Sequence, residues 1–175
     1  MDNFFHPSLF PSKKDFDSNK FLNAVKGTEF EKCIYQGVAN AWGKTKEVFR
    51  NGDKSLILLG QYLHEEVFNF IRKACRTLMP NEDIIFYQAP EGNKKSFFTY
   101  KGYIFIIKKS DVVRGKTEPN LVIKEQLCDS HVITIEYVLD ELRENITSTA
   151  FLYKKGNITI FSYVIPNNNI EIDKK

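Results

Sequence analysis

The chain has 175 residues, of which 42% are hydrophobic and 14% aromatic, and this composition supports a folded core and excludes a disordered chain. Its formal net charge is only +3, and its 25 basic residues comprise 20 lysines and 5 arginines. This balance argues against a dedicated duplex-DNA-binding protein, because such proteins usually carry a basic stripe in which arginine contacts guanine and phosphate.

The chain changes character near Pro80, where apolar residues at helical spacing give way to β-branched and aromatic runs. We predict a single α+β domain, with an N-terminal helical hairpin packed on a mostly antiparallel β-sheet of five to seven strands. It divides into an irregular arm (1–15), a helical part (16–80), a β-rich part (81–165) and a polar tail (166–175).

Three helices are predicted before Pro80. The first is short and spans about residues 17–26. Thr28 and Glu31 have the spacing of a capping box, which marks the start of the next helix. Residues 29–49 and 55–79 each carry apolar side chains at steps of three and four, so we expect two amphipathic helices that pack on each other.

The β-rich part begins with a strand at 84–87. Residues 96–109 predict two strands joined by a tight turn, because Lys101-Gly102 separates two β-branched and aromatic runs. Further strands are expected at 121–123, 132–138, 150–153 and 158–164.

The hairpin 96–109 is the main candidate for a function outside the core. With Lys101-Gly102 as the turn, Tyr100 faces Tyr103, and one face of the hairpin is aromatic. We predict that this face contacts a protein partner or a second copy of the chain. The candidate interface residues are Phe98, Tyr100, Lys101, Tyr103 and Phe105.

Both faces of this hairpin are apolar, because Phe97, Ile104 and Ile106 occupy the face opposite the candidate residues. One helical layer covers only one face of a sheet, so the hairpin needs a second covering. The alternative to a partner is that the N-terminal arm or a curled sheet buries the aromatic face as core.

Two patterns resemble ligand-binding motifs without meeting their requirements. Residues 37–45 have one residue too many for a phosphate-binding P-loop and lie inside a predicted helix, so we expect Lys44 to be a surface lysine. Cys128 and His131 have metal-ligand spacing, but no second close pair completes a four-ligand site. We therefore expect no metal and no other cofactor.

A metal-dependent nuclease of the restriction-endonuclease type needs an acidic residue, any residue and a lysine at the end of its motif. The nearest match, residues 91–94, is one residue too long. No nucleophilic triad is recognisable either, so an enzyme is the less favoured class.

The three cysteines, Cys33, Cys75 and Cys128, are widely spaced, which favours reduced thiols in a cytoplasmic protein. No apolar run reaches the length of a membrane span, so we expect no membrane partner.

The leading functional hypothesis is a small cytoplasmic, non-enzymatic protein-binding module that acts as an inhibitor, antitoxin-like or accessory factor. One alternative is a single-stranded nucleic-acid binder that stacks bases on the aromatic hairpin 96–109, whose flanks carry lysines. The other is a degenerate metal-dependent nuclease.

Overall fold

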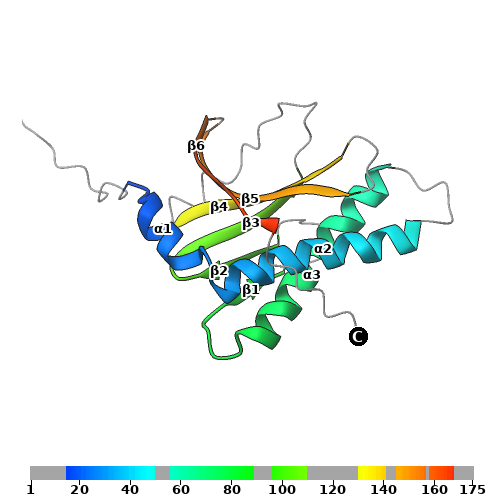
Figure 1. The fold of residues 1–175 in the computed structure, drawn as a ribbon, viewed down its shortest axis with the longest axis horizontal. Helices are drawn as coiled ribbons and strands as arrows, with labels where there is room; N and C mark the ends of the chain where they lie inside the picture. The colour runs from blue at the N-terminus through cyan, green and yellow to red at the C-terminus, as the bar shows by residue number, and fades with distance from the viewer. Residues whose placement is uncertain are drawn as a thin grey trace, which may run out of the picture.

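The computed structural model describes residues 15–49, 56–88, 96–109, 130–140, 145–156 and 158–167. Within these ranges three helices pack on one six-stranded sheet, which confirms the predicted α+β class (Figure 1). The helices are α1 (Ser18–Val25), α2 (Glu29–Phe49) and α3 (Leu56–Leu78). The strands are β1 (Ile85–Tyr87), β2 (Phe97–Tyr100), β3 (Tyr103–Lys109), β4 (His131–Leu139), β5 (Ile146–Lys155) and β6 (Ile158–Val164).

The strands lie in the sheet in the same order as in the chain, from β1 at one edge to β6 at the other. Neighbouring strands are antiparallel except β3 and β4, which are parallel. This parallel pair was not predicted. The predicted strand at 121–123 lies outside the described residues. The division into arm, helical part, β-rich part and tail stays a prediction, since residues 1–14 and 168–175 also lie outside them.

The turn between α1 and α2 is built differently from the capping box that the sequence suggests. The Glu31 carboxylate accepts a hydrogen bond from the amide of Gly27 rather than from that of Thr28. The Thr28 hydroxyl donates to the carbonyl of Val25 over 2.7 Å. Because Val25 is the last residue of α1, Thr28 satisfies a carbonyl at the end of one helix while Glu31 anchors the start of the next.

α2 and α3 are in close contact where Gly37 meets Ile71. A Cβ atom added to Gly37 would lie only 2.9 Å from the Cα atom of Ile71. Because Gly37 has no side chain, its backbone can lie directly against Ile71 of α3. Trp42, further along α2, is buried.

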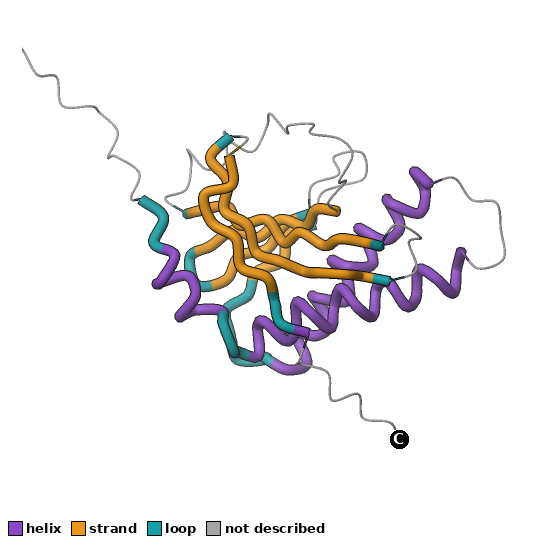
Figure 2. Tube along the Cα trace, turned by 45° about the horizontal axis from the view of Figure 1, so that its top comes forward, coloured by secondary structure: helices purple, strands orange, loops and turns teal. Residues whose placement is uncertain are grey.

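The helices cover one face of the sheet. Figure 1 shows α2 and α3 lying along the same side, with α1 at the end of the sheet near β4 and β6. Aromatic side chains from every layer meet in the core between them. Figure 2 shows β5 and β6 turning away from the other strands at the hairpin that joins them.

Candidate protein interface

The aromatic hairpin forms with the predicted turn and register. Lys101 and Gly102 both have positive φ, at 47° and 81°, as the two residues of a tight turn between antiparallel strands require. Tyr100 pairs with Tyr103, and Phe98 pairs with Phe105 further along the same two strands.

The aromatic face of this hairpin points into the core of the chain. Phe98 and Phe105 have no exposed surface, and Tyr103 is 7% exposed. Tyr100 stacks on Phe30 of α2, with ring centroids 4.3 Å apart. Of the predicted interface residues, Lys101 alone has an exposed side chain. The helices thus cover the face that we assigned to a partner, and base stacking on these rings would require them to leave the core.

The centre of the opposite sheet face is also closed to solvent. Ile104, Val132 and Leu152 are all buried on that face. The exposed large apolar residues of the sheet lie at its two edges instead. They are Ile85 and Tyr87 in β1, and Ile158, Ile160 and Val164 in β6.

β6 presents the more extensive of these two apolar edges. Ile158, Ile160 and Val164 are 68%, 52% and 57% exposed, and Ser162 between them is also exposed. We call these four residues the β6 edge surface. The strand of seven residues contains no charge, proline or glycine, whereas β1 has only three residues. No described strand lies beyond β6.

The hydrogen-bond pattern shows which backbone groups of β6 face outward. The Ile165 amide, just after the strand, donates to the carbonyl of Thr149 over 2.8 Å. In an antiparallel pair the residues that bond to the neighbouring strand alternate with residues that point away from it. The amide and carbonyl groups of Ser162 and Val164, which lie opposite Leu152 and Ala150, therefore point away from β5.

The register between β5 and β6 shifts next to Tyr153 and Lys154. Tyr153 pairs with Phe161 and Lys154 pairs with Thr159, so Ile160 is the extra residue of a β-bulge. A bulge disturbs strand pairing locally. The regular part of the outer edge therefore runs from Phe161 to Val164.

The inward side chains of β6 fix the strand against the helices. The ring of Phe161 lies 5.7 Å from that of Phe21 in α1. The Tyr163 hydroxyl donates to the Glu31 carboxylate of α2 over 2.7 Å. Burial, assisted by this hydrogen bond, raises the pKa of Tyr163 to about 12. β6 is therefore held in an extended conformation, and no other described strand pairs with its outer edge.

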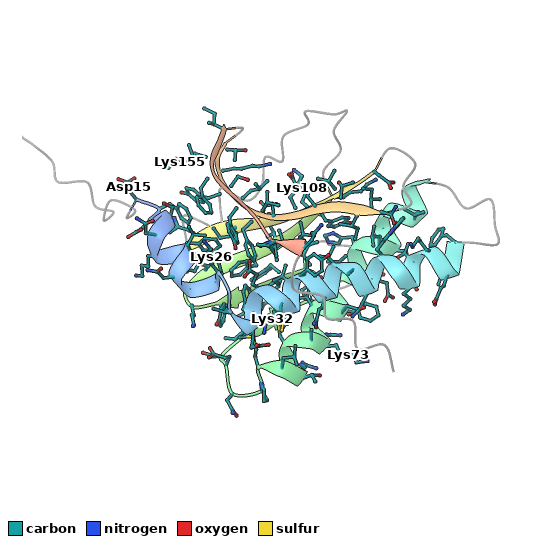
Figure 3. The ribbon with its side chains drawn as sticks, viewed as in Figure 1. Asp15, Lys26, Lys32, Lys73, Lys108 and Lys155 are labelled. Atoms are coloured by element: carbon teal, nitrogen blue, oxygen red, sulfur yellow. The ribbon has the colours of Figure 1, made fainter. Side chains whose placement is uncertain are left out.

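Charged residues lie beside this strand at the β5–β6 hairpin. The Lys155 ammonium lies 3.6 Å from a carboxylate oxygen of Asp15, at the end of the sheet where both are labelled in Figure 3. Lys154 is at the same distance, 3.6 Å, from Glu136 of β4. Both pairs are partly or largely exposed, so they contribute little to stability.

The other patterns discussed above do not form a site in the described part of the chain. Residues 37–45 lie within α2, and the Lys44 ammonium is exposed, 3.0 Å from the Glu66 carboxylate. That hydrogen bond raises the pKa of Lys44. Cys128 and residues 91–94 lie outside the described ranges. Among described residues no group of three or more His, Cys, Asp or Glu lies close enough together to hold a metal ion.

No protein-family model matches the sequence, and no curated protein or solved structure matches the chain. None of the described helices combines the length and apolar character that crossing a membrane demands.

The sequence prediction did not include the β6 edge surface. The strand itself was predicted at 158–164, the bounds that the structure gives. The available signal was the absence of charge along this run. It became informative only when the strand order placed β6 at an edge.

Proposed function

We propose that this chain is a non-enzymatic protein-binding module of the cytoplasm, an inhibitor, antitoxin-like or accessory factor that binds a partner protein along β6. The partner would supply an extended segment that pairs with the outer edge of the strand. Backbone hydrogen bonds give such a complex its affinity, and the side chains at alternate positions give it specificity.

The observation that supports this proposal is the combination of exposed apolar side chains with a backbone edge that no other described strand pairs with. Natural edge strands usually avoid pairing with other chains by being short or by carrying lysine or proline. β1 is short, but β6 is a seven-residue strand without a charge or a proline. Its bulge at Ile160 disturbs only one end, so Ser162 and Val164 remain able to pair.

The geometry of β6 also defines the kind of partner segment that could pair with it. It is extended, it pairs antiparallel or parallel with residues 161–164, and it presents apolar side chains beside Val164 and Ile160. Each of these two side chains is about half exposed, at 57% and 52%. Completing the burial of one such side chain contributes about 1 kcal/mol, roughly half of the value for full burial.

The test uses a substitution that removes one outward amide without affecting the pairing of β5 with β6. Ser162→Pro removes an amide that points away from β5, and proline is tolerated at such edge positions. Ser162→Ala keeps the amide and is the matched control. Binding is measured by capture of partners from the native host, their identification, and titration of the purified partner by calorimetry.

We expect Ser162→Pro to weaken the affinity at least tenfold and Ser162→Ala to leave it nearly unchanged. Val164→Lys should also weaken binding, whereas Ile85→Lys, at the exposed edge formed by β1, should not. Circular dichroism melting checks that each variant is folded. A partner that binds wild type and Ser162→Pro equally would show that β6 is not the interface.

A further inference from the structure

Cys33 and Cys75 face each other across the two long helices. Cys33 lies four residues before Gly37 in α2, and Cys75 lies four residues after Ile71 in α3. Gly37 and Ile71 are in direct contact between the two helices. Since one helical turn is 3.6 residues, the two cysteines occupy matching positions about one turn away from that contact. Each thiol shifts the pKa of the other, which places the two side chains next to each other.

The thiols are buried, but a cavity leads to one of them. Cys33 and Cys75 are 0% and 2% exposed, and neither is in a disulfide. A cavity of about 200 Å³ adjoins Cys75 at the end of α3. Its lining combines buried and exposed residues, namely Cys75, Arg76, Met79, Pro80, Glu82, Ile84 and Phe86.

The size of this cavity limits which oxidants can reach Cys75. Its volume is several times the roughly 30 Å³ that a water molecule occupies in the liquid. A molecule as small as hydrogen peroxide therefore fits in the cavity. The exposed Pro80 and Glu82 side chains place part of the lining at the surface.

The contact between the sulfur atoms favours one thiolate in the pair. The hydrogen bond from Cys75 lowers the pKa of Cys33, because it stabilises the negative charge on the Cys33 sulfur. The same bond and burial raise the pKa of Cys75. The thiolate is the nucleophile in cysteine oxidation, so the pair holds one nucleophile beside one protonated partner.

We propose that Cys33 and Cys75 form a dithiol that hydrogen peroxide oxidises to a disulfide between α2 and α3. Peroxide enters through the cavity beside Cys75, and the neighbouring Cys33 sulfur attacks one of its oxygens as the thiolate. The O–O bond breaks, and a sulfenic acid at Cys33 and hydroxide form. The sulfur of the other cysteine, which gives up its proton, then attacks the sulfenic sulfur. The S–S bond forms as the S–O bond breaks. In total two thiols and one hydrogen peroxide give one disulfide and two water molecules.

This modification does not depend on the proposed function. In the reduced state the two helices are held by non-covalent contacts, and a disulfide would join them about one turn away from the contact between Gly37 and Ile71. A link between residues that are far apart in sequence restricts the unfolded chain. The oxidised chain should therefore melt at a temperature about 5–15 °C higher than the reduced chain.

The test uses the full chain with Cys128→Ser, which leaves Cys33 and Cys75 as its two thiols. The protein is treated with hydrogen peroxide under native conditions, and thiols are counted after unfolding. We expect the count to fall from two to zero and the mass to fall by two hydrogen atoms. Peptide mapping without reductant should locate the bond, and dithiothreitol should restore both thiols and the lower melting temperature.

Cys33→Ala in the same background is the control, since it keeps Cys75 and the cavity but removes the second sulfur. It should keep its one thiol and gain no oxygen, and its melting temperature should not rise. Two outcomes in the parent would overturn the proposal. Both thiols could survive a peroxide excess that oxidises free cysteine, or Cys75 could take up oxygen without forming the disulfide.

Discussion

Gly37→Ala tests the helix packing on which the rest of the fold is built. The added Cβ atom would lie 2.5 Å from Cγ1 of Ile71 and 2.9 Å from both its Cα and its amide nitrogen. Rotating the Ile71 side chain relieves the first contact. The contacts with the backbone persist, so α2 and α3 must move apart.

The size of the effect follows from two opposing contributions. A carbon–carbon contact is about 3.5 Å or longer, so the Cα atom of Ile71 must move by about 0.6 Å from its 2.9 Å position. Overpacking of this kind costs about 1–3 kcal/mol, and the upper half applies because backbone has to move. Alanine in a helix interior recovers about 1 kcal/mol relative to glycine. We expect a net loss of about 1–2 kcal/mol.

Gly43→Ala is the matched control, because Gly43 lies in the same helix and has no atom within 4 Å of an added Cβ. It should raise the stability by about 0.5–1 kcal/mol. Urea unfolding followed by circular dichroism measures both variants. The two substitutions should change the melting temperature in opposite directions. Gly37→Ala should melt about 2–8 °C below wild type, and Gly43→Ala should melt above it. A Gly37→Ala variant as stable as Gly43→Ala would refute the close approach at this residue.

Three further predictions concern the core, the partly buried Tyr163–Glu31 hydrogen bond and the surface. Tyr103→Ala should destabilise the chain by about 3 kcal/mol or more in urea unfolding, because its ring packs 5.1 Å from that of Phe21; a neutral result would place Tyr103 outside the core. The Tyr163 pKa is raised from 10.0 to about 12, so its hydroxyl stabilises the fold fully below about pH 10, and this contribution is lost as the pH rises through 12. Wild type should therefore lose more stability than Tyr163→Phe across that range, and identical curves would contradict the Glu31 contact. Lys44→Ala should change stability by less than about 0.5 kcal/mol, and neither ATP nor GTP should raise the melting temperature of the wild type.

The helices were predictable because their signal is local and repeated. The predicted range 29–49 has the bounds of α2, and 55–79 differs from α3 by one residue at each end. An apolar stripe at helical spacing over more than twenty residues predicts an α-helix and does not fit a strand. The hairpin register was equally local, since the turn at Lys101-Gly102 fixes which residues pair.

The assignment of the two hairpin faces was not predictable from the same information. One face carries Tyr100 and Tyr103, and the other carries Ile104 and Ile106. Both satisfy the pattern of a strand buried on two sides. Which face meets the helices depends on the connection from α3 into β1 and on the parallel pairing of β3 with β4. Neither can be read from local spacing, because both involve residues far apart in the chain.

The sequence of β6 disagrees with the position of the strand in the sheet. Residues 158–164 have the composition of a central strand, with β-branched and aromatic residues and no charge. The structure places them at an edge, where such a sequence exposes apolar side chains and open backbone groups. Disagreement of this kind is expected at functional positions, because elsewhere selection against misassembly replaces such residues with charges. Tyr163 and Phe161 on the inner side would hold the strand equally well if Val164 were lysine. The apolar outer side is therefore not required by the core, and the proposed partner strand would give it a physical reason.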